Sequence, residues 1–296
     1  MFHSMEEILI AASKQPLCKI ALICPYHKLN WESLAQVQDL RIEFVCIGED
    51  HRLTHFPKLP GVSILSVHSE EEAIATAIRM LYDGQADILM NGLANPKRIF
   101  DEIIEQERLQ NKNPTLSHIG CFEIPSYSKK MLLLTDAGVN IAPDLVAKVE
   151  ITRNAIKTTH SLGYKQPKVA IIAPIEKVNP KNLPSTVDAA AIAQMGRMGQ
   201  LGTAIVDGPL ALDNAVSKRA AKIKKINSPV AGQADVLVVH DIETGNILYK
   251  ILTFYGKAKV AATVSGASFP IAMPSRTDTI VNRIHSMALA KLLVKG

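Results

Sequence analysis

Polar loops follow three apolar runs in the last third of the chain, and each contains side chains that could contact a ligand. The runs Thr203–Asp207, Asp235–Val239 and Lys259–Val264 have the short, apolar character of buried strands. Because the loops after parallel strands meet at one edge of a sheet, where α/β proteins bind ligands, we expect these loops to form one site. The residues that one ligand could contact there are Asp207, Asp213, Asp241, Gly245, Asn246, Ser275 and Arg276.

Ser275 and Arg276 place a hydroxyl beside a guanidinium near the end of this stretch. The planar guanidinium of arginine can donate two parallel, charge-assisted hydrogen bonds to a phosphate. A serine hydroxyl can donate to the same phosphate or to an oxyanion that develops next to it. The residues alone leave a second interpretation open, in which this dipeptide only forms a loop before a helix.

The tripeptide Thr244, Gly245 and Asn246 marks a predicted helix start. Free backbone N–H groups at a helix N-terminus bind anions, and a glycine lets a ligand approach the backbone closely. The alternative is that Thr244 caps the helix and the glycine is only tolerated. Asp213 either caps the helix that follows it or bonds a neighbouring loop, and Asp241 is a weaker site candidate because it simply follows a strand.

Alternating strands and helices must position these loops. The first half of the chain carries four apolar runs with predicted helices between them, and Lys168–Ala173 begins a second series of the same kind. This rhythm is typical of parallel sheets covered by helices on both faces, which makes the chain an α/β protein. The four runs are Lys19–Cys24, Ile42–Ile47, Val62–Val67 and Asp87–Met90.

The rhythm breaks near the middle of the chain. Ser117–Glu123 and Met131–Leu134 are two strand-like runs with a short link, so we expect them to pair antiparallel. A long helix is predicted from about Pro143 to Leu162, with proline early and glycine just past its end. Ser69-x-x-Glu72 and Ser185-x-x-Asp188 have the spacing of helix N-terminal caps.

Composition restricts the classes of function. With 296 residues the chain is long enough for two domains, and its formal charge of +5 favours small anionic ligands. Aromatic residues make up only 5% and do not interleave with basic ones, so nucleic acid is not an expected partner. No signal peptide or membrane helix is predicted. We expect buried free thiols, typical of a reducing compartment, rather than a zinc site at Cys18, Cys24, Cys46 and Cys121.

Several stretches in the same order resemble the phosphate acetyl/butyryltransferase family. They are DGPLALDNA, SPVAG-x-AD, DIETGNILYK and the late Ser-Arg pair, together with FEIP at Phe122–Pro125 and LTDAGVNIAPDL at Leu134–Leu145. The chain is most similar to the phosphate butyryltransferase branch, and the resemblance covers most of its length.

The resemblance implies an isocitrate/isopropylmalate dehydrogenase-like fold, with two α/β domains and the site in an interdomain cleft. The first domain would be residues 1–136 plus 266–296, and the second residues 137–265. The implied reaction moves a short acyl group, butyryl or acetyl, between CoA and inorganic phosphate through a ternary complex. CoA is then a substrate, no tightly bound cofactor or metal is needed, and the protein is a cytoplasmic homodimer or higher homo-oligomer without a membrane partner.

Within the resemblance, Ser275 and Arg276 match the family's Ser-Arg pair and are implied to be catalytic. The acetyl branch has an aspartate seven residues after the serine, proposed to take the thiol proton, but here that residue is Asn282. The butyryl branch resembles this chain in having an aspartate at Asp278. Three interpretations stay open: Asp278 is the base, the thiolate leaves unaided, or Asp278 caps the last helix.

The resemblance implies substrate contacts at Asn246, Gly245, Lys97, Asp241 and Asp213. An arginine near Lys97 is thought to bind substrate in the acetyl branch, so the candidate cations here are Lys97 and its neighbour Arg98. A solvated surface lysine is the alternative.

Two departures keep other functions open. One is Asn282, and the other is Asn91, where the butyryl branch often has a lysine. A catalytically degenerate relative that binds CoA or an acyl phosphate remains an alternative. So do another phosphate acyltransferase, such as one of lipid synthesis, and a metal-dependent decarboxylating dehydrogenase of the same fold.

Overall fold

The structure, a computed structural model, describes residues 1–127 and 130–294, and the chain forms two compact units. The first unit comprises Met5–Leu116 with Lys259–Gly296, and the second comprises Met1–Ser4 with Ser117–Ala258. These limits differ from the domain boundaries expected after residue 136 and before residue 266. The division into functional domains therefore stays a prediction.

In the first unit the strand order is β3-β2-β1-β4-β11-β10. The first five of these pair parallel, as the alternating pattern predicted, whereas β10 runs antiparallel to β11. The loop directly after β10 consequently leads to the opposite edge from the one expected, and it is the end of β11 that carries the chain towards Ser275. The strands are β1 (Cys18–Ile23), β2 (Ile42–Glu49), β3 (Val62–Val67), β4 (Ile88–Asn91), β10 (Lys259–Ser265) and β11 (Ile271–Ala272).

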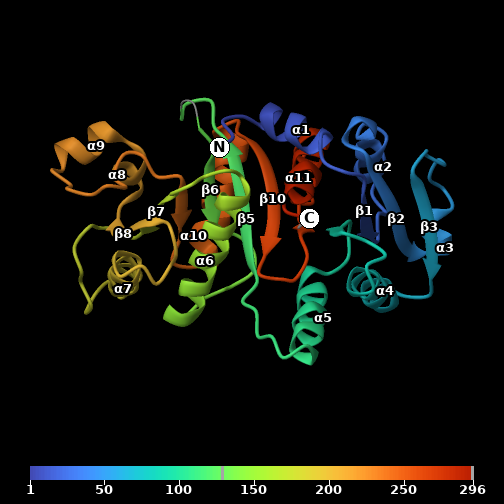
Figure 1. Cartoon of the computed structure of the whole chain (residues 1–296), viewed down its shortest axis with the longest axis horizontal. Helices are drawn as coiled ribbons and strands as arrows, with labels where there is room; N and C mark the ends of the chain where they lie inside the picture. Colours follow the sequence, from blue (N-terminus) through green and yellow to red (C-terminus); the bar gives the residue numbers. More distant parts are fainter. Residues whose placement is uncertain (128–129, 295–296) are drawn as a thin grey trace. The chain divides into compact units, whose positions relative to one another are not determined.

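Helices cover both faces of this sheet. In Figure 1, α4 and α5 lie together on one side of the sheet, and α1, α2 and α11 lie on the other. This two-sided cover explains why β1 is buried along nearly its whole length instead of alternating between apolar and polar residues. The helices are α1 (Met5–Ser13), α2 (Lys28–Leu34), η1 (Gln38–Leu40), α3 (Asp50–Leu53), α4 (Glu70–Tyr82), α5 (Pro96–Leu109) and α11 (Ile280–Leu292).

In the second unit the strand order is β5-β6-β9-β7-β8. The predicted antiparallel pairing of β5 with β6 is confirmed, and the remaining pairs are parallel. Asp207 lies inside β8, where its carboxylate pairs with Arg197 at 3.2 Å, so it does not belong to the loop in which it was expected. The strands are β5 (Ser117–Glu123), β6 (Leu132–Thr135), β7 (Lys168–Ile172), β8 (Ile205–Leu210) and β9 (Val236–Val238).

Helices also lie on both faces of the second sheet, with α6 and α7 on one side and α8 and α9 on the other (Figure 1). The long predicted helix is confirmed as α6, which Asp144 caps by accepting a hydrogen bond from the Ala147 N–H at 2.8 Å. The helices are α6 (Leu145–Ser161), α7 (Ser185–Arg197), α8 (Leu212–Val216), α9 (Lys218–Ile223), α10 (Ile242–Lys250) and η2 (Ile251–Tyr255).

The two predicted caps behave differently. Ser69 caps α4 as expected, because its hydroxyl accepts a hydrogen bond from the Glu72 N–H at 3.1 Å. Ser185 does not cap α7, because it is already the first residue of the helix and Pro184 precedes it. The carboxylate of Asp188 instead accepts a hydrogen bond from the buried Lys148 Nζ at 2.7 Å, which ties α7 to α6.

Two further predictions concern the cysteines and membrane-spanning helices. The four cysteines are buried free thiols, as predicted, and burial raises the pKa of Cys46 to about 12. Across residues 1–127 and 130–294, no helix combines the length and the apolar character needed to cross a membrane.

Candidate functional site

A closed turn presents Ser275 in the first unit. After β11 the chain turns so that the Ser275 N–H donates to Asp278 Oδ2 at 2.6 Å, and the Asp278 N–H donates to the Ser275 carbonyl at 3.0 Å. Asp278 is buried, with 6% of its surface exposed. Two hydrogen bonds between the same residues therefore fix the backbone of Ser275, while its hydroxyl stays half-exposed beside the Thr277 hydroxyl at 3.1 Å.

Arg276, the next residue in this turn, is exposed. Its Nη2 donates a long hydrogen bond, 3.4 Å, to the Ala94 carbonyl. No carboxylate within residues 1–127 and 130–294 forms an ion pair with Arg276. An arginine side chain that is not paired with a carboxylate keeps donors that can bind an anion.

Of the three interpretations of Asp278, the structure does not support the helix cap. Thr279 caps α11, since its hydroxyl accepts a hydrogen bond from the Asn282 N–H at 3.2 Å. The side chain of Asn282 is buried, and its Oδ1 accepts a hydrogen bond from the Val260 N–H at 3.2 Å, which joins α11 to β10. Asn282 thus has a packing role, and Asp278 remains available for the roles that do not depend on capping.

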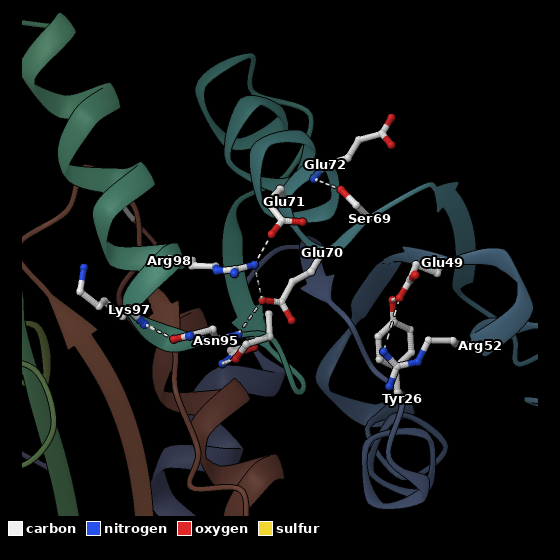
Figure 2. A network of polar contacts seen from close by, with 12 residues as sticks. Tyr26, Glu49, Arg52, Ser69, Glu70, Glu71, Glu72, Asn95, Lys97 and Arg98 are labelled. Atoms are coloured by element: carbon white, nitrogen blue, oxygen red, sulfur yellow. Dashed lines mark hydrogen bonds and ion pairs between the residues drawn. The ribbon is translucent and has the colours of Figure 1, made fainter.

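Lys97 and Arg98 both have carboxylate partners, whereas Arg276 has none among the residues that the structure describes. Lys97 Nζ pairs with Asp101 at 2.6 Å along the surface of α5, and the side chain of Lys97 is 80% exposed. Arg98 pairs with Glu70 and Glu71 at the start of α4. In Figure 2 the side chain of Lys97 points away from the contacts that Arg98 makes with the two glutamates.

The end of β4 lies close to Arg276. Asn91, the last residue of β4, is buried, and its Nδ2 donates to the Ala94 carbonyl at 3.1 Å. That carbonyl also accepts the hydrogen bond from Arg276, so the amide and the guanidinium share one acceptor. Asn91, where the butyryl branch often has a lysine, therefore lies close to Arg276.

The second unit has a pocket of about 460 Å³ at the carboxyl ends of its parallel strands. Of the residues expected to meet one ligand, Asp213 and Asp241 line it, and Thr244 lies beside them. Apolar side chains form much of the remaining wall, so the pocket suits a ligand with a largely neutral surface. The other lining residues are Ile172, Ala173, Pro174, Ser185, Ala211, Leu212 and His240.

Asp241 caps α10. Its Oδ1 accepts a hydrogen bond from the Thr244 N–H at 2.8 Å, so the aspartate, and not Thr244, is the cap. Burial raises the pKa of Asp241, but the hydrogen bonds from Thr244 outweigh this and hold the pKa below its ordinary value. Burial, helped by the charge of Lys148, lowers the pKa of the neighbouring His240. The pocket consequently contains an ionised carboxylate and a neutral imidazole at pH 7.

Asp213 does not cap α8, because Ala211 occupies the cap position and makes no side-chain bond there. Its carboxylate pairs with Lys224 Nζ at 2.9 Å and accepts a hydrogen bond from the Asn214 N–H at 2.8 Å. The hydrogen bond from Lys224 lowers the pKa of Asp213, which is therefore ionised. Lys224 also pairs with Glu176 at 2.9 Å. One lysine therefore links the segment after β7, which contains Glu176, to the start of α8, which contains Asp213.

Gly245 and Asn246 contact the loop that follows β6 and do not line the pocket. A Cβ on Gly245 would overlap the carbonyl oxygen of Asp136, which accounts for glycine at this position. Asn246 Nδ2 donates to the Ala137 carbonyl at 3.2 Å. The start of α10 is thereby packed directly on this loop.

The Asp136 carboxylate holds that loop and was not singled out from the sequence. It is buried and accepts backbone hydrogen bonds from Gly138, Val139 and Asn140 at 2.8 to 3.0 Å. An aspartate directly after an apolar run and before small residues was the available signal. A second omission is Arg283, a cation whose signal was its position among the apolar residues of the last helix.

The side chains that could bind a metal are scattered among the residues that the structure describes. Across residues 1–127 and 130–294, no group of three or more His, Cys, Asp or Glu side chains is arranged to hold a metal ion.

Comparisons with known proteins identify relatives along most of the chain. A family model described as "Phosphate acetyl/butaryl transferase" matches residues 58–291. The chain is 41% identical over 256 residues to the probable phosphate butyryltransferase of Bacillus subtilis (strain 168), which covers 86% of this chain and 85% of that protein. It is 39% identical over 246 residues to a phosphate acetyltransferase of Rhizobium meliloti, covering 83% of this chain and 76% of that protein.

Solved structures share the fold. A branched-chain phosphotransacylase from Enterococcus faecalis V583 is 30% identical, with a TM-score of 0.83 over 94% of this chain and 99% of that one. A 4-hydroxythreonine-4-phosphate dehydrogenase from Klebsiella pneumoniae has a TM-score of 0.62 over 94% of this chain and 98% of that one, at 11% identity, which is a likeness of fold alone. The predicted dehydrogenase-like α/β fold class is therefore confirmed.

The Gly245→Ala substitution distinguishes packing from ligand approach. Because the new methyl group meets the backbone of Asp136, we expect the free energy of unfolding to fall by roughly 1–3 kcal/mol in urea titrations. Gly138→Ala is the matched control, since the nearest atoms to its Cβ are side-chain atoms of His118, at 3.4 Å or more. A Gly245→Ala protein as stable as the control would contradict the packing role.

Proposed function

Because the chain belongs to the phosphate acetyl/butyryl transferase family, we propose that its Ser275–Asp278 turn binds inorganic phosphate and directs it at the thioester of an acyl-CoA. The protein is a phosphate acyltransferase, which transfers a short acyl group, butyryl or acetyl, between CoA and phosphate. The observation that carries the proposal is that Arg276, an exposed residue without a carboxylate partner within residues 1–127 and 130–294, directly follows Ser275 in a turn whose backbone is held by Asp278.

The reaction needs positioning more than covalent catalysis. An oxygen of hydrogen phosphate attacks the thioester carbonyl carbon, the new C–O bond forms, and the C–S bond breaks. The proton that the phosphate loses is the one that the CoA thiol gains, so the products are acyl phosphate and CoA. Phosphate is already a usable nucleophile near neutral pH, which makes a ternary complex sufficient and an acyl-enzyme unnecessary.

Arg276 is the proposed phosphate ligand, since its fork can donate two hydrogen bonds to one anion. Ser275 is the proposed donor to the developing oxyanion or to the phosphate. The backbone of Ser275 is held on both sides by Asp278, so the hydroxyl has a defined position before substrate arrives.

Asp278 is the proposed acceptor of the proton in transit. The geometry removes the capping interpretation and leaves two: proton transfer through Asp278, or departure of the thiolate without a base. Its carboxylate lies directly behind Ser275, with one oxygen bonded to the Ser275 N–H. Asn282 cannot replace it, because an amide does not take up a proton at neutral pH.

We assign the other predicted substrate-binding residues to contacts with acyl-CoA. The pocket of the second unit presents Asp213 and Asp241 as ionised carboxylates, which favour amide or amino N–H groups over phosphates. The neutral parts of CoA carry such donors. Asn246 and Gly245, and Lys97 in the first unit, stay proposed substrate contacts.

We also propose that the enzyme is a cytoplasmic homodimer. Ile247, Ile251, Phe254 and Tyr255 form an exposed apolar stripe along α10 and η2, which a second copy would cover. The buried free cysteines favour a reducing compartment. Sedimentation equilibrium tests the assembly, and a monomer at all concentrations would contradict it.

Arg276→Ala tests the phosphate site. We expect kcat/KM for phosphate to fall by at least about 10²-fold, because the variant loses a charge-assisted donor to the anion. Arg276→Lys should recover part of the loss, since an ammonium keeps the charge but not the fork. The assay follows free CoA thiol released from butyryl-CoA over a range of phosphate concentrations.

Arg153→Ala is the matched control for Arg276→Ala, since Arg153 is an exposed arginine that pairs with Glu150 along α6. We expect it to leave kcat/KM unchanged. Near-normal turnover in Arg276→Ala would rule out the assignment.

The Asp278→Asn substitution tests the proton acceptor. If Asp278 takes up the proton, protonating it at low pH slows the wild-type enzyme, and the variant should be slow at every pH without that acid limb. The measurement is the pH dependence of kcat for the wild type and the variant. An unchanged profile in Asp278→Asn would mean that the thiolate leaves without this base.

A further inference from the structure

Arg283 is a buried arginine directly beneath the Ser275–Asp278 turn. It lies on α11 and exposes only 1% of its surface. Its Nη2 donates to the Arg276 carbonyl at 3.0 Å and to the Ser275 carbonyl at 3.4 Å. Its Nη1 donates to Asn30 Oδ1 on α2 at 2.8 Å. One guanidinium therefore contacts the main chain of both residues of the Ser-Arg pair.

These contacts complete the anchoring of Ser275. The Ser275 N–H is bonded to Asp278, and its carbonyl accepts from both the Asp278 N–H and Arg283. The carbonyl of Arg276 is bonded to the same guanidinium. Since the main-chain groups are fixed on the protein side, the two side chains can be presented on the opposite side.

A buried cation at this point is costly, which suggests that it serves more than packing. Burial lowers the pKa of Arg283, and the charge of Asp278 acts in the opposite direction. The Nε of Arg283 has no hydrogen-bond partner within the described residues. A leucine or methionine would fill the space without this penalty, but it could not hold two carbonyl oxygens.

We propose that Arg283 is a positioning residue for phosphate binding, which fixes the direction of Ser275 and Arg276 through their carbonyl groups. The inference rests on the proposed function of the turn. The last helix then contributes to anion binding through Arg283. Replacing this guanidinium should lower kcat/KM for phosphate more than it affects the KM for acyl-CoA.

The test compares Arg283→Met and Arg283→Lys by steady-state kinetics, varying phosphate and butyryl-CoA separately. For Arg283→Met we expect kcat/KM for phosphate to fall on the order of 10²-fold, because small misplacements of binding groups have effects of this size. The KM for butyryl-CoA should stay within about 2-fold of the wild type. Arg283→Lys should recover part of the loss, since an ammonium can still donate to one of the carbonyls.

Lys291→Met is the matched control. Lys291 is the other buried cation of α11, and it donates to the carbonyls of Leu40 and Arg41. Its loss should lower thermal stability without raising the KM for phosphate. If Arg283→Met does not fold, Asn30→Ala removes only the contact at Nη1 and should raise the KM for phosphate in the same direction by a smaller factor.

The outcomes separate three cases. A selective effect on phosphate in the Arg283 or Asn30 variants supports the positioning role. A fall in kcat that follows the folded fraction, with both KM values unchanged as in Lys291→Met, overturns it. A folded wild type without phosphate-dependent thiol release would instead contradict the proposed function itself.

Discussion

Two side chains of opposite charge, Asp278 and Arg283, hold the main chain of the Ser-Arg pair from inside the first unit. Asp278 accepts the Ser275 N–H, and Arg283 donates to the carbonyls of Ser275 and Arg276. A loop of this kind has no regular hydrogen-bond ladder of its own, so without these contacts its backbone groups would lose their buried partners. In the proposed function, this fixed turn holds the phosphate beside the thioester.

The parallel sheet determines where this turn lies. β4 and β11 run parallel, so Asn91 at the end of one and the Ser275 turn after the other follow the same edge. Ala94 joins them by accepting hydrogen bonds from Asn91 and Arg276. The same rule operates in the second unit, where the loops after β7, β8 and β9 line one pocket. Loops with little structure of their own acquire positions from the strands that precede them.

Patterns that depend on local physics could be predicted from the sequence. The run Lys19–Cys24 is apolar throughout because β1 is covered on both faces, and Ser69 caps α4 because its spacing to Glu72 suits that bond. Contacts between distant segments could not be predicted. The antiparallel direction of β10 and the contact between Asn30 and Arg283 follow from tertiary packing, which no spacing in the sequence encodes.

The residues of the candidate site also differ in how far the sequence could predict their contacts. Residue type made Ser275 and Arg276 candidates for anion binding, but the resemblance to the family was needed to prefer this role over that of a plain loop. Residue type was not enough to predict the cap at Asp241 or the close packing of Gly245, because both residue types also occur in ligand-binding loops. Their contacts with substrate stay a proposal. Only their neighbours, Thr244 and Asp136, show what these residues contact.

Release of free CoA thiol from acetyl-, propionyl-, butyryl- and isobutyryl-CoA, with and without phosphate, tests the central claim most directly. The account predicts release that requires phosphate and is strongest for one acyl chain, which would also identify the substrate. Release that does not depend on phosphate, or none from a folded protein that still binds CoA, would contradict it.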